Sequence, residues 1–267
     1  MEVVERFVAG KNGDPARCED AIVETRHHFA VIDGATDISG RSYDGMSGGR
    51  WAMVACAQAL LTLADDIDAY AAVASLTRTL ADRVDPDLSP AERPSAAVTI
   101  FSVTRREIWQ IGDVGFAYAG LDPAVGQPRK RIDQIAADFR AAVIAASAPV
   151  DLDTEDPGRE AVRALVGRQG NLRNTVGPYA YAGIDGRPVP PSLIVVHPLP
   201  ATITDLIIAS DGYPVIHPTL AETEAILATL IARDPWCVAE LAGTKGVRRG
   251  QISFDDRSYL RLRASSR

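Results

Sequence analysis

Short apolar runs separated by polar residues recur along this chain and predict strands. Two of them flank Arg26 and His27 and form a predicted hairpin. Three central runs, separated by short polar stretches, predict an antiparallel meander. The predicted strands cover residues 3–9, 21–23, 28–32, 96–103, 107–111, 114–119, 193–196, 205–210 and 259–262.

Longer segments with apolar residues at helical spacing lie between these strands. They predict helices over residues 51–63, 69–83, 132–147, 159–166, 219–232 and 235–242. Thr219 and Glu222 form a capping-box pattern at the start of one of them. Antiparallel strands with helices inserted in pairs indicate an α+β sandwich. We see no internal repeat and no clear linker, and therefore expect a single domain over residues 1–267.

Carboxylates stand at the ends of three predicted strands. Asp33 follows a buried-type strand and precedes Gly34, and Asp211 ends a second such strand. Asp255 lies just before the last strand. Convergent carboxylates suit hard divalent cations, which take oxygen ligands. An Asp-Gly pair at a strand end is also a common turn, so these residues alone leave both a metal site and plain turns open.

Composition narrows the class of protein. The 267 residues are 46% hydrophobic, as in ordinary globular proteins, and the net charge is -7. An acidic chain argues against nucleic acid, an anionic membrane or a metal nuclease activity. The three scattered cysteines predict no disulfide framework and favour the cytoplasm. We find no signal-peptide core and no apolar run that could span a bilayer.

Six short blocks occur in an order that resembles the metal-dependent protein phosphatases, the serine/threonine phosphatases of type 2C. Together they cover nearly the whole chain. The resemblance implies an α-β-β-α sandwich of two stacked antiparallel sheets flanked by helix pairs, with two Mn²⁺ or Mg²⁺ ions at one end. The blocks lie at residues 19–21, 29–34, 95–98, 111–113, 205–212 and 255–258.

The resemblance also assigns roles to single residues. It implies that Asp33 bridges the two ions and that the Gly34 carbonyl holds one of them. It implies that Asp211 and Asp255 bind the other ion.

Three further positions belong to this implied metal site. Glu19 and Asp20 are expected to act through metal-bound waters. A third, weaker ion is expected beside an acidic residue after the central strands, for which Asp138 is the nearest match.

The implied reaction is the hydrolysis of a phosphomonoester. Two ions can bind a bridging water and lower its pKa, and the resulting hydroxide attacks phosphorus in line. No serine or cysteine nucleophile is required. Cys18, beside two carboxylates, is expected to be a small packing residue, since neighbouring negative charge disfavours its thiolate.

The sequence departs from the family where the substrate would bind. Pro15 stands where the family usually has an arginine for phosphate, and Ala35 replaces a histidine or methionine. Val114 stands where a serine is usual. We hypothesise that Arg17, two residues before Glu19 and on the same strand face, binds the phosphate. The rival cations are Lys11, Arg168, Arg173, Lys245, Arg248 and Arg249.

Two functions therefore stay open at this stage. The first is a Mn²⁺- or Mg²⁺-dependent phosphatase in the cytoplasm, acting on a phosphorylated protein or a small phosphoester. The second is a phosphatase-fold binding or regulatory module with little or no activity. The complete carboxylate set favours the enzyme, because converging acids repel each other without cations. The missing phosphate arginine favours the module.

Overall fold

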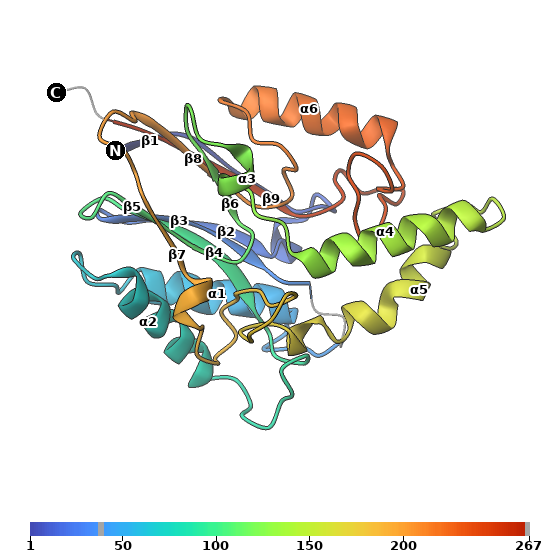
Figure 1. Cartoon of the computed structure of the whole chain (residues 1–267), viewed down its shortest axis with the longest axis horizontal. Helices are drawn as coiled ribbons and strands as arrows, with labels where there is room; N and C mark the ends of the chain where they lie inside the picture. Colours follow the sequence, from blue (N-terminus) through green and yellow to red (C-terminus); the bar gives the residue numbers. More distant parts are fainter. Residues whose placement is uncertain (37–39, 265–267) are drawn as a thin grey trace.

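The computed structural model describes residues 1–36 and 40–264 and confirms an α+β fold with two antiparallel sheets (Figure 1). The four-stranded sheet has the order β1-β9-β8-β6, and the five-stranded sheet has the order β2-β3-β4-β5-β7. The first sheet contains β1 (Glu2–Ala9), β6 (Gly115–Ala117), β8 (Asp205–Ala209) and β9 (Arg257–Arg263). The second contains β2 (Asp20–Glu24), β3 (His28–Gly34), β4 (Ala96–Ser102), β5 (Glu107–Ile111) and β7 (Val195–Pro198).

The central strands do not form the continuous meander that we predicted. β3, β4 and β5 pair in sequence, and β2 and β3 form the expected hairpin. β6 instead leaves for the other sheet and pairs with β8. The chain changes sheets just after Gly112, whose φ of 93° is readily adopted by glycine. This turn carries Asp113 to the end of both sheets.

Five of the six predicted helices form, with small shifts in their ends. They are α1 (Gly48–Leu60), α2 (Ala69–Ala81), α4 (Arg131–Ala146), α5 (Pro157–Val166) and α6 (Leu220–Arg233). A short α3 (Pro123–Gly126) was not predicted, and neither were the 3-10 turns Pro15–Arg17, Gln169–Asn171 and Pro191–Leu193. Thr219 caps α6 by accepting a hydrogen bond from the Glu222 amide, as the sequence indicated. In the part of the chain that the structure describes, no helix has the length and apolar character needed to cross a membrane.

The helix predicted over residues 235–242 is wrong. The Asp234 carboxylate accepts hydrogen bonds from the amides of Val238, Ala239 and Leu241, at 2.9 to 3.0 Å. One side chain therefore satisfies backbone donors in a compact turn, which competes with a helix.

Three buried clusters hold the elements together. One combines Val31 and Phe101 of the five-stranded sheet with Ile208 and Leu260 of the other, so it lies between the sheets. A second packs α1 and α2 against the five-stranded sheet. A third packs Leu227 of α6 against the four-stranded sheet. In the described part of this cluster the helical residues come from α6 alone, whereas we expected a pair of helices (Figure 1).

The N-terminal segment is attached to the last strand where the acidic residues gather. β1 pairs with β9 along its length. Beyond this ladder, Asp256 accepts hydrogen bonds from the amides of Lys11, at 2.8 Å, and Glu19, at 2.7 Å. Chain segments from opposite ends of the sequence thus meet beside Asp255.

The start of α1 packs directly on the end of β3. An added Cβ on Gly34 would collide with the carbonyl oxygen of Gly49, and one on Gly49 would collide with Ala35 and Glu19. Only two glycines allow this approach of backbone to backbone. It fixes the strand end that carries Asp33.

Candidate active site

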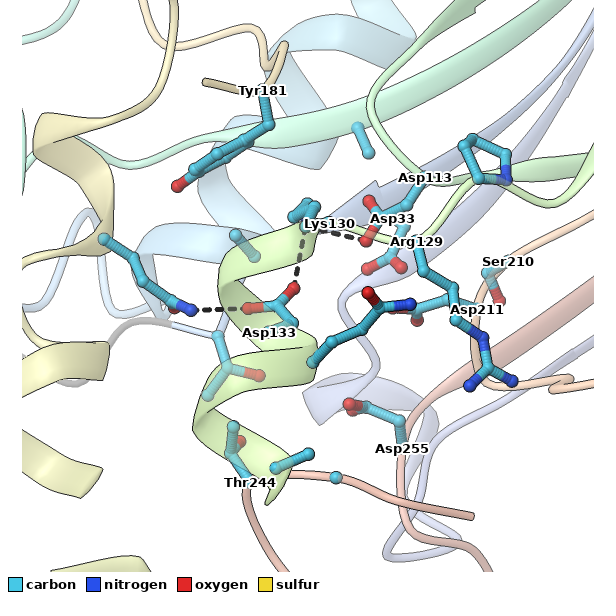
Figure 2. Close-up of a pocket in the computed structure, with 18 of the residues that line it drawn as sticks. Asp33, Asp113, Arg129, Lys130, Asp133, Tyr181, Ser210, Asp211, Thr244 and Asp255 are labelled. Atoms are coloured by element: carbon cyan, nitrogen blue, oxygen red, sulfur yellow. Dashed lines mark hydrogen bonds and ion pairs between the residues drawn. The ribbon is translucent and has the colours of Figure 1, made fainter. Parts of the chain in front are cut away.

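A cavity of about 590 Å³ opens at the end of the sheets. Six aspartates line it, and Figure 2 shows the four that stand at strand ends around one opening. Asp33 lies near the end of β3, Asp113 in the turn after β5, Asp211 just after β8 and Asp255 just before β9. The three strand-end acids predicted from the sequence do therefore reach one cavity.

Asp20 and Asp33 face each other across the β2–β3 hairpin. Asp20 is buried, and its Oδ2 accepts a hydrogen bond from Ser258 Oγ at 2.8 Å, whereas its Oδ1 has no hydrogen-bond partner among the described residues. Burial and then the nearby charges of Asp256 and Asp211 raise the pKa of Asp20 to about 8, against the opposing effect of the serine hydrogen bonds. Burial and then Asp20 and Asp211 raise the pKa of Asp33 well above its ordinary value.

Asp211 is an exposed residue that lines the cavity among other acids. Partial desolvation by the surrounding protein, followed by the charges of Asp113 and Asp255, raises its pKa to about 7. Together, Asp20, Asp33 and Asp211 form an acidic group that has less positive charge nearby than its own negative charge requires.

Asp255 is in a different electrostatic position. Lys11 Nζ lies 3.0 Å from its Oδ1, and Lys245 Nζ lies 3.0 Å from its Oδ2. Burial would raise the pKa of Asp255, but the two ammonium groups outweigh it and hold this pKa at about 2. Asp255 is thus ionised and already neutralised by the protein.

Glu19 lies outside the lining of the cavity, as does Asp20. The two oxygens of Glu19 accept hydrogen bonds from Ser47 Oγ at 2.5 Å and Thr36 Oγ1 at 3.0 Å. Ser47 is also the N-cap of α1. Glu19 therefore connects the acidic group to the start of this helix.

The two weakest sequence hypotheses fare differently. Asp138 lines the cavity from α4, as an exposed residue with no hydrogen bond or ion pair among the described residues. Arg17 does not line the cavity. Its side chain is 78% exposed and lies 3.8 Å from Asp14, because the 3-10 turn Pro15–Arg17 replaces the strand that would have aimed it inward. The hypothesis that Arg17 binds the phosphate is therefore not supported by the geometry.

The lining residues that were not assigned to the site from the sequence include Asp113, Arg129, Lys130 and Asp133. Asp113 follows a strand in the same way as Asp33 and Asp211, so the strand-end signal could have found it. Nothing in the local pattern marks the other three, which depend on how the start of α4 packs against the sheet ends.

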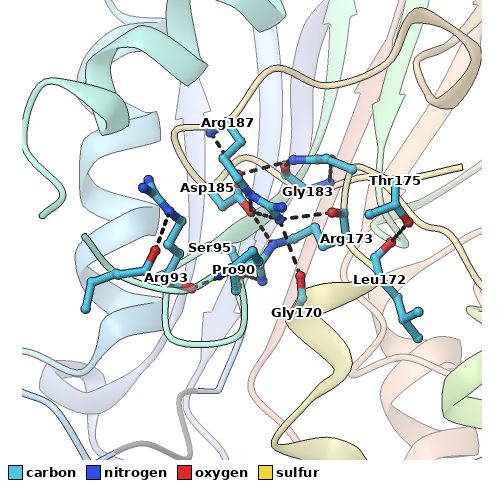
Figure 3. A network of polar contacts seen from close by, with 12 residues as sticks. Pro90, Arg93, Ser95, Gly170, Leu172, Arg173, Thr175, Gly183, Asp185 and Arg187 are labelled. Carbon is cyan, nitrogen blue, oxygen red and sulfur yellow. Dashed lines mark hydrogen bonds and ion pairs between the residues drawn. The ribbon is translucent and has the colours of Figure 1, made fainter. Parts of the chain in front are cut away.

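Arg173 also reaches the cavity but is committed to the fold. Its guanidinium donates to Asp185 at 2.6 Å and to Ser95 at 2.5 Å, and also to the carbonyl oxygens of Pro90 and Arg93 (Figure 3). Arg173 is 5% exposed. Binding a phosphate would require it to break this network.

The donor set suits a divalent cation, although no complete coordination shell is formed. Among residues 1–36 and 40–264, no three His, Cys, Asp or Glu side chains converge closely enough to hold one ion. The unpartnered Asp20 Oδ1 and the raised pKa values of Asp20, Asp33 and Asp211 nevertheless mark a place where positive charge is lacking. Carboxylate oxygens are the ligands that Mg²⁺ and Mn²⁺ prefer, so the residues fit such an ion chemically.

Comparison with known proteins shows which solved structures have a similar fold. No protein-family model matches the sequence, and no curated protein matches it. The serine/threonine phosphatase Stp1 from Staphylococcus aureus is 12% identical with a TM-score of 0.51, over 100% of this chain and 96% of that one. A bacterial serine phosphatase is 11% identical with a TM-score of 0.51, over 100% and 99%. The phosphatase PstP from Mycobacterium tuberculosis is a looser match, at 17% identity and a TM-score of 0.49 over 99% and 100%. The first two matches show that this chain has a fold similar to that of bacterial serine/threonine phosphatases.

Proposed function

We propose that this chain is a phosphomonoester hydrolase that depends on Mn²⁺ or Mg²⁺ and resembles protein serine/threonine phosphatases. The observation that carries the proposal is the acidic group of Asp20, Asp33 and Asp211, which is short of positive charge at the edge of an open cavity. The fold similarity to serine phosphatases supports it.

Within this proposal, Asp33, the Gly34 carbonyl, Asp211 and Asp255 would hold two divalent ions, while Glu19 and Asp20 support them from behind the cavity wall. Asp255 would have to exchange its ion pairs with Lys11 and Lys245 for the metal. When bound, such ions supply the charge that activates water and stabilises the phosphoryl oxygens. The chain's own residues fix the strand ends, and in the absence of metal Lys11 and Lys245 keep Asp255 ionised.

Arg129 is the best candidate for contact with the phosphate. It lines the cavity near Asp211, and no hydrogen bond or ion pair engages it among the described residues (Figure 2). Its guanidinium could form bidentate hydrogen bonds with a phosphate. Lys245 is a weaker candidate, since it is already paired with Asp255.

The proposal also includes the finer points of the fold. We infer a four-layer α-β-β-α arrangement within one phosphatase-like domain over residues 1–267. The three core clusters support it, although the outer layer over the four-stranded sheet is a single helix. A cytoplasmic location remains a prediction, supported by three buried and unpaired cysteines. The substrate is a phosphorylated protein or a small phosphoester.

The test is turnover of a small aryl phosphate and of a phosphoserine peptide, each with Mn²⁺ and with a chelator. We expect turnover with Mn²⁺ and none with the chelator. Asp33→Asn removes one negative charge from the acidic group and should lower kcat at least 100-fold. The control is Asp66→Asn, which removes the same charge from an exposed residue outside the cavity lining and should change kcat less than threefold.

Equal turnover by wild type and Asp33→Asn would show that the site is wrongly placed. If wild type binds Mn²⁺ but hydrolyses neither substrate, the alternative of a binding or regulatory module replaces the enzyme. Preference for the peptide over the aryl phosphate would favour a protein substrate.

A further inference from the structure

Lys130 holds an unusual position at the first turn of α4. It is the N-cap residue of this helix, and its side chain makes no capping hydrogen bond. Lysine is a poor N-cap, because it cannot accept a hydrogen bond from the helix amides and its charge opposes the positive end of the helix dipole. The residue type is therefore not explained by the helix that it begins.

The ammonium group of Lys130 lies among acids instead. Its Nζ is 2.7 Å from Asp113 Oδ2 and 3.9 Å from Asp133 Oδ2, and it lies 5.2 Å from the ring centroid of Tyr181 (Figure 2). Asp211 is close enough to contribute to its electrostatic environment. The Lys130 side chain is 22% exposed, so a largely enclosed cation faces acids from the turn after β5, from α4 and from the end of β8.

Of these three acids, Asp113 has the strongest need for a counter-charge, because the Asp133 side chain is 42% exposed and Asp211 is exposed as well. The Asp113 side chain is 9% exposed, and Gln169 donates a hydrogen bond to Asp133 at 2.5 Å, which stabilises that carboxylate without neutralising it. A buried carboxylate without a partner is costly. Among the described residues, the ion pair with Asp113 is made by Lys130 alone.

We propose that Lys130 is a built-in counter-ion of the cavity, whose ammonium group takes the place that a further divalent cation would otherwise occupy among Asp113, Asp133 and Asp211. Lys130 is then a positioning residue: it anchors the start of α4 to the strand ends and neutralises this side of the cavity without metal. The inference rests on the proposed function in that it takes the Asp33 side of the cavity as the part that binds divalent cations.

The test counts the ions. Lys130→Met keeps the length and apolar stem of the side chain but removes the charge. By titration calorimetry and equilibrium dialysis with Mn²⁺, we expect this variant to bind one more ion per chain than wild type. In chelator its melting temperature should fall, and Mn²⁺ should raise it by more degrees than it raises that of wild type.

The matched control is Arg131→Met, which removes a positive charge from the next residue, whose guanidinium lies over the Tyr179 ring. It should bind the same number of ions as wild type. Lys130→Arg, which keeps the charge, should also retain the wild-type number. The double variant Lys130→Met/Asp113→Asn should lose the additional ion. If Lys130→Met is too unstable alone, Lys130→Gln, which also removes the charge, is measured in its place and should bind one more ion than wild type.

An unchanged ion count in Lys130→Met, with a Mn²⁺ response equal to that of Arg131→Met, would overturn the inference. The proposed function fails separately. If wild type binds no Mn²⁺ while Lys130→Met binds one ion, the role of Lys130 stands and the metal-dependent phosphatase does not.

Discussion

Two buried acids in this protein, Asp185 and Asp20, have opposite electrostatic surroundings. Asp185 is fully buried, and its carboxylate accepts hydrogen bonds from Arg173 Nε at 2.6 Å, from Arg187 Nη2 at 2.7 Å and from the Arg187 amide at 2.9 Å. Asp20 is almost as buried, yet its hydrogen bonds come from serine hydroxyls and not from a cation. Its Oδ1 has no hydrogen-bond partner in the part of the chain that the structure describes, and Asp33 lies opposite it.

The presence or absence of a cationic partner distinguishes an acid that stabilises the fold from a candidate site acid more clearly than burial does. The Asp185 network joins the loop around Arg173 to the segment around Pro90 and Ser95, and its carboxylate is neutralised by arginines (Figure 3). The Asp20 and Asp33 pair reduces stability unless protons or cations reach it. A buried acid that lacks partners beside an open cavity is therefore the better guide to a functional site.

The largest expected effect is a loss of stability when the network of Asp185, Arg173 and Arg187 is broken. Asp185→Asn leaves the guanidinium groups of Arg173 and Arg187 without their counter-charge, one of them almost fully buried. Breaking a buried ion pair from one side costs about 3–5 kcal/mol. We expect the free energy of unfolding in urea to fall by this amount.

The matched control for this prediction is Asp205→Asn. Asp205 also accepts hydrogen bonds from two arginines, Arg261 and Arg263, but its side chain is 38% exposed. An exposed pair contributes about 0–1 kcal/mol. If both variants lose the same stability, burial is not what distinguishes the Asp185 network.

The second prediction concerns the pH dependence of the acidic group. The pKa of Asp20 is about 8 in the folded protein, above its ordinary value of 3.8, so the folded state holds this proton more tightly than the unfolded chain does. The contribution of Asp20 to stability is therefore fully present below about pH 4 and is lost, by roughly a few kcal/mol, as the pH rises from about 4 to about 8. Urea unfolding in chelator at pH 5 and pH 8 measures this.

Asp20→Asn cannot titrate, so its stability in chelator should depend less on pH over the same interval. Saturating Mn²⁺ should reduce the dependence in wild type, since it binds the ionised acids of the folded state. An equally steep pH dependence in Asp20→Asn would assign the effect to other groups.

The smallest expected effect separates two arginines. Arg129→Ala should raise KM for an aryl phosphate about tenfold, a loss of about 1.4 kcal/mol, because it removes a guanidinium that lines the cavity. Arg17→Ala should leave KM and kcat within twofold of wild type. The opposite result would restore the hypothesis made from the sequence and remove Arg129 from the site.

Sequence patterns correctly predicted those features of the site and the fold that depend on a single strand or a single helix. The ends of β3 and β8 were predicted because an apolar run stops at Asp33 and at Asp211. The cap of α6 was predicted because Thr219 and Glu222 are neighbours in sequence.

Contacts between distant segments were not predictable in this way. Lys130 and Asp113 meet because α4 begins beside the turn where the chain changes sheets. Lys11 reaches Asp255 because β1 pairs with β9. Arg17 was misplaced because a 3-10 turn, rather than a strand, sets its direction.

The contact between Gly34 and Gly49 has a consequence for finding distant relatives of this chain. No larger residue fits at either position without moving α1 away from β3, and such a movement would displace Asp33. The steric requirement holds whatever the substrate is and however far the surface has diverged. We therefore expect any chain that keeps this approach of α1 to β3 to need a glycine at both positions, whatever else in its sequence has changed.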